Sequence, residues 1–295
     1  MGGLSMDQAF VQAPEHRTKA NLADADGIPV IDLSPLAAGD KAGVDALAAE
    51  VGRASQDWGF FVVVRHGVLA ETVARALEAQ RAFFALPADR KAAVRRDEAA
   101  PLGYYESEHT KNVRDWKEVF DLVPREPPPP AAVADGELVF ENKWPEDLPR
   151  FSPDLALGVG RHKDAGALTI LYQDDVGGLD VRRRSDGEWV RVRPVPDSYV
   201  INVGDIIQVW SNDRYESAEH RVSVNSQKER FSMPYFFNPG SDAMVEPLEE
   251  MVSDERPARY DAYNWGNFFS TRKNSNFRKL DVENVQIAHF RKDRS

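Results

Sequence analysis

The chain of 295 residues contains no cysteine. Disulfide bonds, zinc ribbons, iron–sulfur clusters and thiol nucleophiles are therefore excluded, and a reducing compartment is the simplest location. A surplus of positive charge is also missing, because 37 Lys and Arg residues stand against 48 Asp and Glu residues and the formal net charge is -11. Since nucleic-acid binding by phosphate neutralisation needs clustered basic residues, this balance argues against a nucleic-acid partner.

Long hydrophobic runs are absent as well. No stretch approaches the roughly 20 apolar residues that cross a bilayer, and the N-terminus does not carry the charged and then apolar pattern of a secretion signal. We therefore expect a cytoplasmic protein without a membrane partner. The sequence does contain 42% hydrophobic and 10% aromatic residues, which is enough to bury the core of a large domain.

The first half of the chain predicts strands that alternate with helices. An apolar alternation over residues 28–33 predicts a strand, and residues 44–54 follow with helical spacing. Residues 60–64 are all β-branched or aromatic, which favours a strand buried on both faces. A second helix is expected over residues 70–86, where Pro87 ends it.

Short β segments separated by turns are predicted for the second half. They lie at residues 168–172, 179–183, 189–193, 199–203, 206–210, 222–224 and 231–237. Their regular spacing predicts an antiparallel sandwich or jelly roll rather than a parallel sheet. A proline-rich surface connection at residues 125–136 separates the two halves, and the aromatic tail, residues 263–290, is expected to be helical and to pack back on the body.

Three residues have the chemistry of a metal site. His162 and Asp164 stand two residues apart, so in an extended chain both side chains point to the same face. Such a pair also occurs by chance in surface turns. His220 follows at the start of another predicted strand, and two imidazoles with one carboxylate form the triad that binds Fe(II) with positions left open.

Arg230 and Ser232 form a second pair on one strand face. A guanidinium matches a carboxylate through two parallel hydrogen bonds, and a hydroxyl adds a third, so the pair suits one end of a dicarboxylic acid. Taken singly, Arg230 also fits an exposed strand residue and Ser232 a hydroxyl at the edge of the core.

The ordered set of His-x-Asp, a distant His and Arg-x-Ser resembles the plant class of 2-oxoglutarate/Fe(II)-dependent dioxygenases. Matching segments extend along nearly the whole chain, at residues 28–33, 58–61, 66–67, 103–104, 115–118, 179–181, 202–205 and 219–222. The resemblance implies a mainly β fold, a double-stranded β-helix (jelly roll) core with helical flanks. It also implies four parts: an irregular N-terminus (1–27), a helical and strand region (28–150), the core (151–240) and a helical C-terminal region (241–295).

The resemblance further implies an enzyme with Fe(II) on His162, Asp164 and His220 and the co-substrate 2-oxoglutarate on Arg230 and Ser232. The second co-substrate is O2, and ascorbate is the implied reductant. A monomer of this kind hydroxylates or desaturates a small plant metabolite, of the hormone, flavonoid or indole type, and releases succinate and CO2. By the same resemblance, Tyr104, Tyr105 and Phe236 border the substrate pocket, although plain core packing explains them equally well.

One internal segment departs from the resemblance. In relatives, a pair such as Trp144-Pro145 is followed by two helices and a strand that carries an Asn-x-Tyr motif, whose tyrosine helps to hold 2-oxoglutarate. Here the segment between Phe151 and His162 is too short for these elements, so we expect a core that is incomplete relative to the family. Lys163 also stands where many relatives carry Thr, and its side chain is expected to point away from the iron.

Two alternatives to an active dioxygenase remain open from the sequence. The first is a catalytically impaired splice or gene-model variant that binds metal without turnover, which the short segment favours. The second is an oxidase on the same fold that does not use 2-oxoglutarate. Ethylene-forming and penicillin-type relatives are oxidases of this kind.

Overall fold

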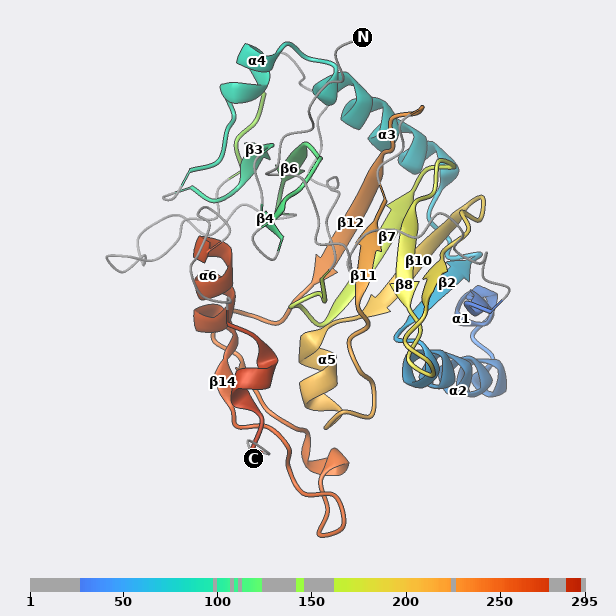
Figure 1. Cartoon of the computed structure of the whole chain (residues 1–295). Helices are drawn as coiled ribbons and strands as arrows, with labels where there is room; N and C mark the ends of the chain where they lie inside the picture. Colours follow the sequence, from blue (N-terminus) through green and yellow to red (C-terminus); the bar gives the residue numbers. More distant parts are fainter. Residues whose placement is uncertain are drawn as a thin grey trace.

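The structure of the chain is a computed structural model (Figure 1). It describes residues 27–97, 100–106, 109–110, 113–123, 142–145, 162–223, 227–275 and 285–292. The proline-rich connection and residues 151–161, where the family resemblance breaks, lie outside the described residues. Among the described helices, none is long and apolar enough to cross a membrane.

Two β-sheets form the centre of the molecule (Figure 1). The larger sheet has the strand order β1 (Val30–Asp32), β2 (Phe60–Val64), β10 (Ser198–Val203), β7 (Leu168–Gln173) and β12 (Ser232–Phe237), and the smaller sheet has the order β11 (His220–Val222), β8 (Leu179–Arg182) and β9 (Trp189–Arg191). All neighbours are antiparallel except β1 and β2. The predicted antiparallel sandwich is therefore confirmed.

Apolar side chains from both sheets pack together and hold them face to face. Phe60 and Val62 of β2 lie in one buried cluster with Leu179 and Val181 of β8 and with Val200 of β10. Each large side chain that is fully buried in this way stabilises the fold by about 1.5–3 kcal/mol. The prediction that residues 60–64 form a buried strand is confirmed.

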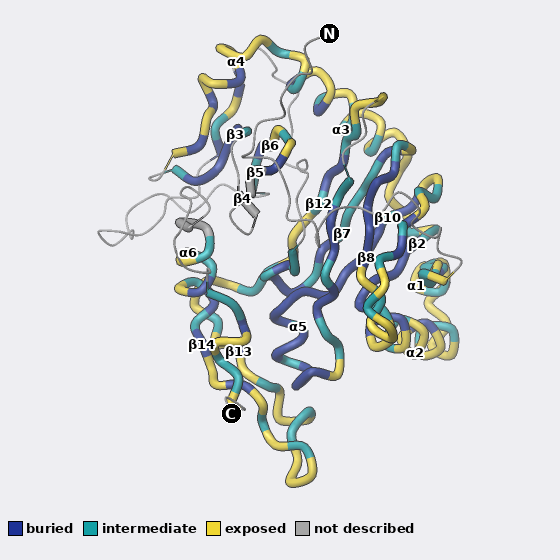
Figure 2. Tube along the Cα trace, in the orientation of Figure 1, coloured by how far each residue is buried: buried dark blue, intermediate teal, exposed yellow. Residues whose placement is uncertain are grey.

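The other face of the larger sheet is covered by α2 (Lys41–Asp57), beside the short α1 (Ser34–Ala38). Asp40 caps α2 by accepting hydrogen bonds from two backbone N–H groups of its first turn. Leu47 and Ala54 of α2 pack with Ile201 of β10, whereas the outer side of the helix is exposed (Figure 2).

Residues 206–210 are helical, so the prediction of a strand there is wrong. Helix α5 (Asp205–Trp210) follows Gly204, and Ile206 and Val209, three residues apart, are both buried. A short apolar run has no periodicity that separates a strand from a buried helix, and here the tertiary contacts favour the helix.

The C-terminal region packs around α5, as predicted. Tyr260, Trp265 and Phe268 share a buried cluster with Ile206 and Val209. This region contains β13 (Met244–Val245), β14 (Tyr263–Asn264), α6 (Trp265–Ser275) and the 3-10 helices Glu249–Met251 and Ile287–Phe290, so it is only partly helical.

A further layer lies along the upper end of β12 and to its left in Figure 1. It contains α3 (Ala70–Phe84), α4 (Ala88–Ala92), β3 (Gly103–Tyr105), β4 (His109–Thr110), β5 (Val113–Arg114) and β6 (Val119–Asp121). The helix predicted over residues 70–86 is thus confirmed to within two residues. The boundaries proposed between the four parts of the chain stay predictions.

Candidate metal centre

A short backbone bridge places two histidines side by side. His162, just before β7, and His220, the first residue of β11, form an isolated antiparallel pair. The N–H group of each donates to the carbonyl oxygen of the other, both at 2.9 Å. Opposite residues of such a pair project to the same side, and the two imidazole centroids lie 4.3 Å apart.

The carboxylate of Asp164 meets both imidazoles. Its Oδ1 atom lies 3.0 Å from Nε2 of His162 and 3.7 Å from Nε2 of His220. Ligand atoms of the three residues all fall within 4.8 Å of one another, and no second group of this kind occurs among the residues that the structure describes. Two imidazole nitrogens and one carboxylate oxygen fit Fe(II) and leave positions for further ligands.

Two neighbouring side chains fix the carboxylate. The hydroxyl of Thr169 and the Nδ2 amide of Asn202 both donate to Oδ2 of Asp164, the latter at 2.7 Å. Oδ1 is thereby left to face the histidines. Burial raises the pKa of Asp164, but the charges of His220 and His162 and the hydrogen bonds outweigh it and hold the pKa well below its usual range. Asp164 is therefore an anion at neutral pH.

The His220 ring is oriented from its other nitrogen. Nδ1 lies 3.2 Å from the carbonyl oxygen of Ala218, so a proton on Nδ1 leaves the Nε2 lone pair directed at the site. Phe60 packs against the ring edge to face, with centroids 5.1 Å apart. Burial, followed by the charge of His162, lowers the pKa of His220 to about 4. The imidazole is therefore neutral at neutral pH, which is the form that binds metals.

Arg230 is a partly buried guanidinium surrounded by neutral acceptors. Its nitrogen atoms donate to the carbonyl of Gly177 at 2.7 Å, to the Ser232 hydroxyl at 2.9 Å and to Oε1 of Gln173 at 3.2 Å. Among the described residues it makes no ion pair, and burial lowers its pKa against the opposing charge of Asp174. A cation held in this way is pre-positioned for an external anion.

Strand β7 contacts both the metal triad and Arg230. Thr169 contacts Asp164 and Gln173 contacts Arg230, and the two residues lie four apart on one face of the strand. The triad and the Arg230–Ser232 pair are thus carried on the same side of the larger sheet.

The three aromatic residues predicted at the substrate pocket lie in two different parts of the structure. Phe236 is the register partner of Thr169, so it shares the triad's face of the sheet and is exposed. Tyr104 and Tyr105 are buried in the other layer, where Tyr104 packs with Phe83 and donates its hydroxyl hydrogen to Glu118. Their described contacts favour the core-packing interpretation.

Several residues around these groups were not singled out by the sequence. Thr169 and Asn202 reach Asp164 because they are opposite one another in the β7–β10 register, which no local pattern reveals. Gln80 of α3 donates to the carbonyl oxygen of Ser232 at 2.9 Å from 152 positions away. Of these residues, only Asn202 had a signal in the sequence, because it stands in segment 202–205, which matches the dioxygenase family.

Comparison with known proteins identifies the family. The chain is 33% identical to a feruloyl CoA ortho-hydroxylase of Ipomoea batatas, over 88% of this chain and 84% of that protein. Residues 140–239 match the 2OG-Fe(II) oxygenase superfamily, and residues 28–147 match the non-haem dioxygenase in morphine synthesis N-terminal family. The chain belongs to the 2OG-Fe(II) oxygenase superfamily. This oxygenase is therefore an oxidoreductase that uses Fe(II) and 2-oxoglutarate.

A further relative and a solved structure extend the comparison. Jasmonate-induced oxygenase 2 of Arabidopsis thaliana is 34% identical over 82% of this chain and 78% of that protein. The crystal structure of JOX2 in complex with 2OG, Fe and JA superposes with a TM-score of 0.68 at 29% identity, covering 90% of each chain. The predicted double-stranded β-helix of the oxygenase is confirmed by this likeness.

The alignments also show a gap in the oxygenase. The match to the Ipomoea batatas hydroxylase runs over 307 positions, yet 88% of a 295-residue chain supplies fewer residues than that. That relative therefore carries residues without a counterpart here, in agreement with the short segment between Phe151 and His162.

Proposed function

We propose that the oxygenase hydroxylates or desaturates a small plant metabolite of the hormone or phenolic type and releases succinate and CO2. The proposal is supported by the convergence of two imidazoles and one anionic carboxylate on the same side of the larger sheet as a partly buried arginine that makes no ion pair among the described residues. Its substrate class comes from the relatives, whose names specify feruloyl CoA hydroxylation and a jasmonate-induced oxygenase.

His162, Asp164 and His220 are the proposed ligands of Fe(II). Their donor atoms need little rearrangement, because the backbone bridge fixes both histidines and two hydrogen bonds fix the carboxylate. Bound Fe(II) supplies the oxidising chemistry with O2 and 2-oxoglutarate. The protein supplies the ligand geometry and keeps the imidazole of His220 neutral.

Arg230 and Ser232 are the proposed partners of the distal carboxylate of 2-oxoglutarate. The guanidinium is held in place by Gly177 and Gln173, so little side-chain entropy is lost when the anion binds. The anion in turn compensates a charge whose described hydrogen bonds all go to neutral acceptors. Phe236, exposed on the same face, is the proposed apolar contact of the substrate.

A second candidate function is metal binding without turnover. It is favoured by the residues that the relatives carry and this chain lacks, since by the family resemblance the lost segment includes a co-substrate contact. The two functions differ in succinate release and agree in iron binding.

The test is anaerobic loading with Fe(II), addition of 2-oxoglutarate and oxygenated buffer, and measurement of succinate with and without a panel of phenolic acyl thioesters and plant hormones. Substrate-stimulated succinate release that disappears in His220→Ala is the expected result. Iron bound at one equivalent without succinate release from any mixture would select the second function. Absence of iron binding would refute both.

A further inference from the structure

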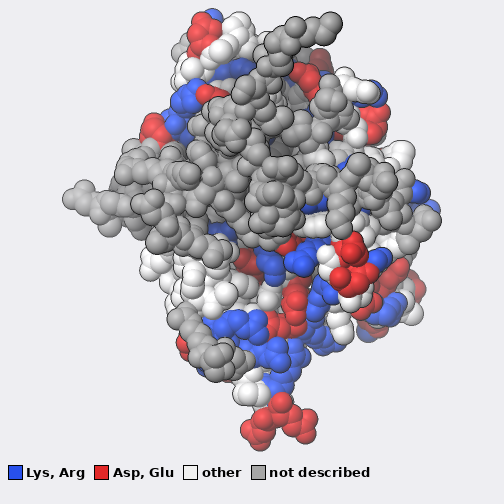
Figure 3. Space-filling view, in the orientation of Figure 1, with Lys and Arg blue, Asp and Glu red and all other residues white. Residues whose placement is uncertain are grey.

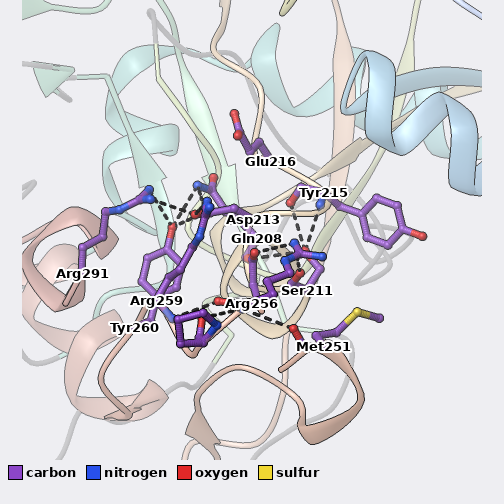
Figure 4. Close-up of polar contacts among 12 residues, drawn as sticks. Gln208, Ser211, Asp213, Tyr215, Glu216, Met251, Arg256, Arg259, Tyr260 and Arg291 are labelled. Atoms are coloured by element: carbon purple, nitrogen blue, oxygen red, sulfur yellow. Dashed lines mark hydrogen bonds and ion pairs between the residues drawn. The ribbon is translucent and has the colours of Figure 1, made fainter. Parts of the chain in front are cut away.

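A polar network with a buried centre lies between α5 and the C-terminal region (Figure 4). We propose that Gln208, on α5, is a positioning residue for the iron ligand His220, acting through the backbone of residues 217–218. This inference depends on the proposed role of His220 in binding iron.

Gln208 directly contacts the loop that leads into β11. Its side-chain carbonyl oxygen accepts a hydrogen bond from the N–H group of Ser217 at 3.0 Å. Its amide nitrogen donates to Oδ1 of Asp213 at 2.9 Å and to the hydroxyl of Tyr260 at 3.1 Å. Gln208 is buried, so these bonds are not exchanged with bulk water.

The direction of the hydrogen bonds in this network is fixed. Tyr260 also donates its hydroxyl hydrogen to Oδ1 of Asp213, so its oxygen is free to accept from Gln208. Asp213 and Tyr260 both accept hydrogen bonds from the amide nitrogen of Gln208. If the amide rotated by half a turn, its oxygen would face these two acceptors and its nitrogen would face the N–H group of Ser217, so all three hydrogen bonds would be lost. The side-chain oxygen of Gln208 therefore stays toward Ser217.

The far side of the loop is also constrained. Gly59 has a left-handed φ of 66°, and a Cβ atom there would lie 2.7 Å from the carbonyl oxygen of Glu216. The loop is thus held between Gln208 and Gly59. Ala218, the next residue after Ser217, is the one whose carbonyl oxygen lies 3.2 Å from Nδ1 of His220. A shift of the Ser217 peptide would move the acceptor that sets the tilt of the ring.

The C-terminal region fixes the network from behind. Arg259 and Arg291 contact Oδ2 of Asp213 at 3.1 and 2.9 Å, and Arg256 donates to the carbonyl oxygens of Ser211 and Asn212 at the end of α5. Figure 4 shows these arginines and Tyr260 approaching from the C-terminal ribbon. Lys and Arg side chains gather on the lower part of the face drawn in Figure 3, despite the net charge of -11.

The probe for this role is Co(II), titrated anaerobically into the full chain and followed by its visible absorption. In Gln208→Met the side chain keeps its length and loses all three hydrogen bonds, so we expect the dissociation constant for Co(II) to rise about 10-fold, the lower end of the effects found for groups that orient a metal ligand. Gln208→Glu keeps an acceptor for Ser217 but repels Asp213. We therefore expect it to lower the melting temperature while the Co(II) affinity stays within about threefold of the wild type.

Two further variants separate the possible outcomes. Asn142→Leu removes a buried amide that bonds the backbone of Val123 in the other layer, and it should lower the melting temperature without changing Co(II) affinity. His220→Ala should abolish Co(II) binding. Unchanged binding in His220→Ala would overturn the metal centre itself. If His220→Ala loses Co(II) binding but Gln208→Met binds Co(II) as the wild type does, only the role of Gln208 is refuted. The same holds if every variant loses Co(II) affinity in proportion to the fall in its melting temperature.

Discussion

The metal centre, which lies between the two sheets, and the outer strand β12 of the larger sheet differ in how many neighbours support them. At the metal centre, Asp164 and His220 are buried, and every polar atom that orients them has a partner. Those partners come from β7, β10 and the residues beside β11, which hydrogen bonds within the two sheets hold in register. Nothing in this part of the site requires the residues that relatives carry in addition.

Strand β12 has the opposite character. Among the described residues it pairs with β7 alone, and Tyr235, Phe236 and Phe237 are 46%, 40% and 57% exposed. Exposed aromatic side chains on an outer strand favour association with other chains. From this comparison we expect the remaining core to bind iron without the segment that the relatives carry, and we expect stability and co-substrate binding to be more sensitive to its loss.

The largest expected effect is on the metal centre itself. Alanine in place of His162, Asp164 or His220 should abolish iron binding, since two ligands seldom retain the ion against chelators. Asp164→Glu should fail as well, because the longer side chain displaces the oxygen. Iron content after gel filtration with a chelator is the measurement, and Lys163→Thr, between two of the ligands, is the control that should keep its iron. Normal iron in any of the alanine variants would overturn the assignment.

Restoring the missing segment should have the next largest effect. An antiparallel core without an inner strand leaves backbone groups unpaired, each at about 1–3 kcal/mol if buried, against a total stability of only about 5–15 kcal/mol. We expect the chain as it stands to melt at low temperature and to release succinate slowly, and a chain with a relative's segment inserted between Phe151 and His162 to improve both. Cooperative melting above about 50 °C with ordinary succinate release from the present chain would contradict this expectation.

Substitutions of Arg230 and Ser232 should have a smaller effect, on the 2-oxoglutarate requirement alone. Arg230→Lys replaces a planar fork by a point charge, and the 2-oxoglutarate concentration for half-maximal succinate release should rise at least about tenfold, or ~1.4 kcal/mol. Ser232→Ala removes a single hydrogen bond to a charged group, about 1.5–3 kcal/mol if the bond is fully formed. Iron affinity should be unchanged in both variants. An unaltered 2-oxoglutarate dependence in Arg230→Lys would move the co-substrate site elsewhere.

These contrasts also show what the sequence could predict. His162 with Asp164, and Arg230 with Ser232, were accessible because residues two apart share a face of an extended chain, which is a local property. His220 was added by its residue type and its place at the start of a predicted strand. The support for Asp164 was not accessible, because Asn202 and Thr169 meet only through the register of β10 and β7. Residues 206–210 were assigned to a strand because a short apolar run lacks a decisive period.

Support for the carboxylate should matter less than the ligands do. Asn202→Leu removes the donor at 2.7 Å from Oδ2 of Asp164 and leaves the hydroxyl of Thr169 in place. We expect Fe(II) affinity to fall about 10-fold, toward the lower end of the effects found for such partners. Competition with a chelator of known affinity measures the change. An affinity equal to that of the wild type would show that Thr169 alone fixes Asp164.

The smallest expected effect is a pH dependence of stability away from the metal. Burial raises the pKa of Asp213, but hydrogen bonds from Tyr260, Gln208 and Arg259 outweigh it and leave the pKa below its ordinary value. Because the folded-state pKa is the lower one, the group binds protons more readily when unfolded, so its stabilisation is complete above about pH 4 and is lost as the pH falls through the folded value.

Urea unfolding at about pH 6 and about pH 3 measures this contribution, with Asp213→Asn as the matched variant. Asparagine tolerates the left-handed backbone at this position, where φ is 67°, so the substitution removes the charge without adding backbone strain. The wild type should lose more stability than the variant between the two pH values, because only the wild type protonates here. Other carboxylates, including Asp164, titrate in both proteins and cancel in the difference. Equal losses in the two proteins would show that the C-terminal arginines hold α5 without help from the charge of Asp213.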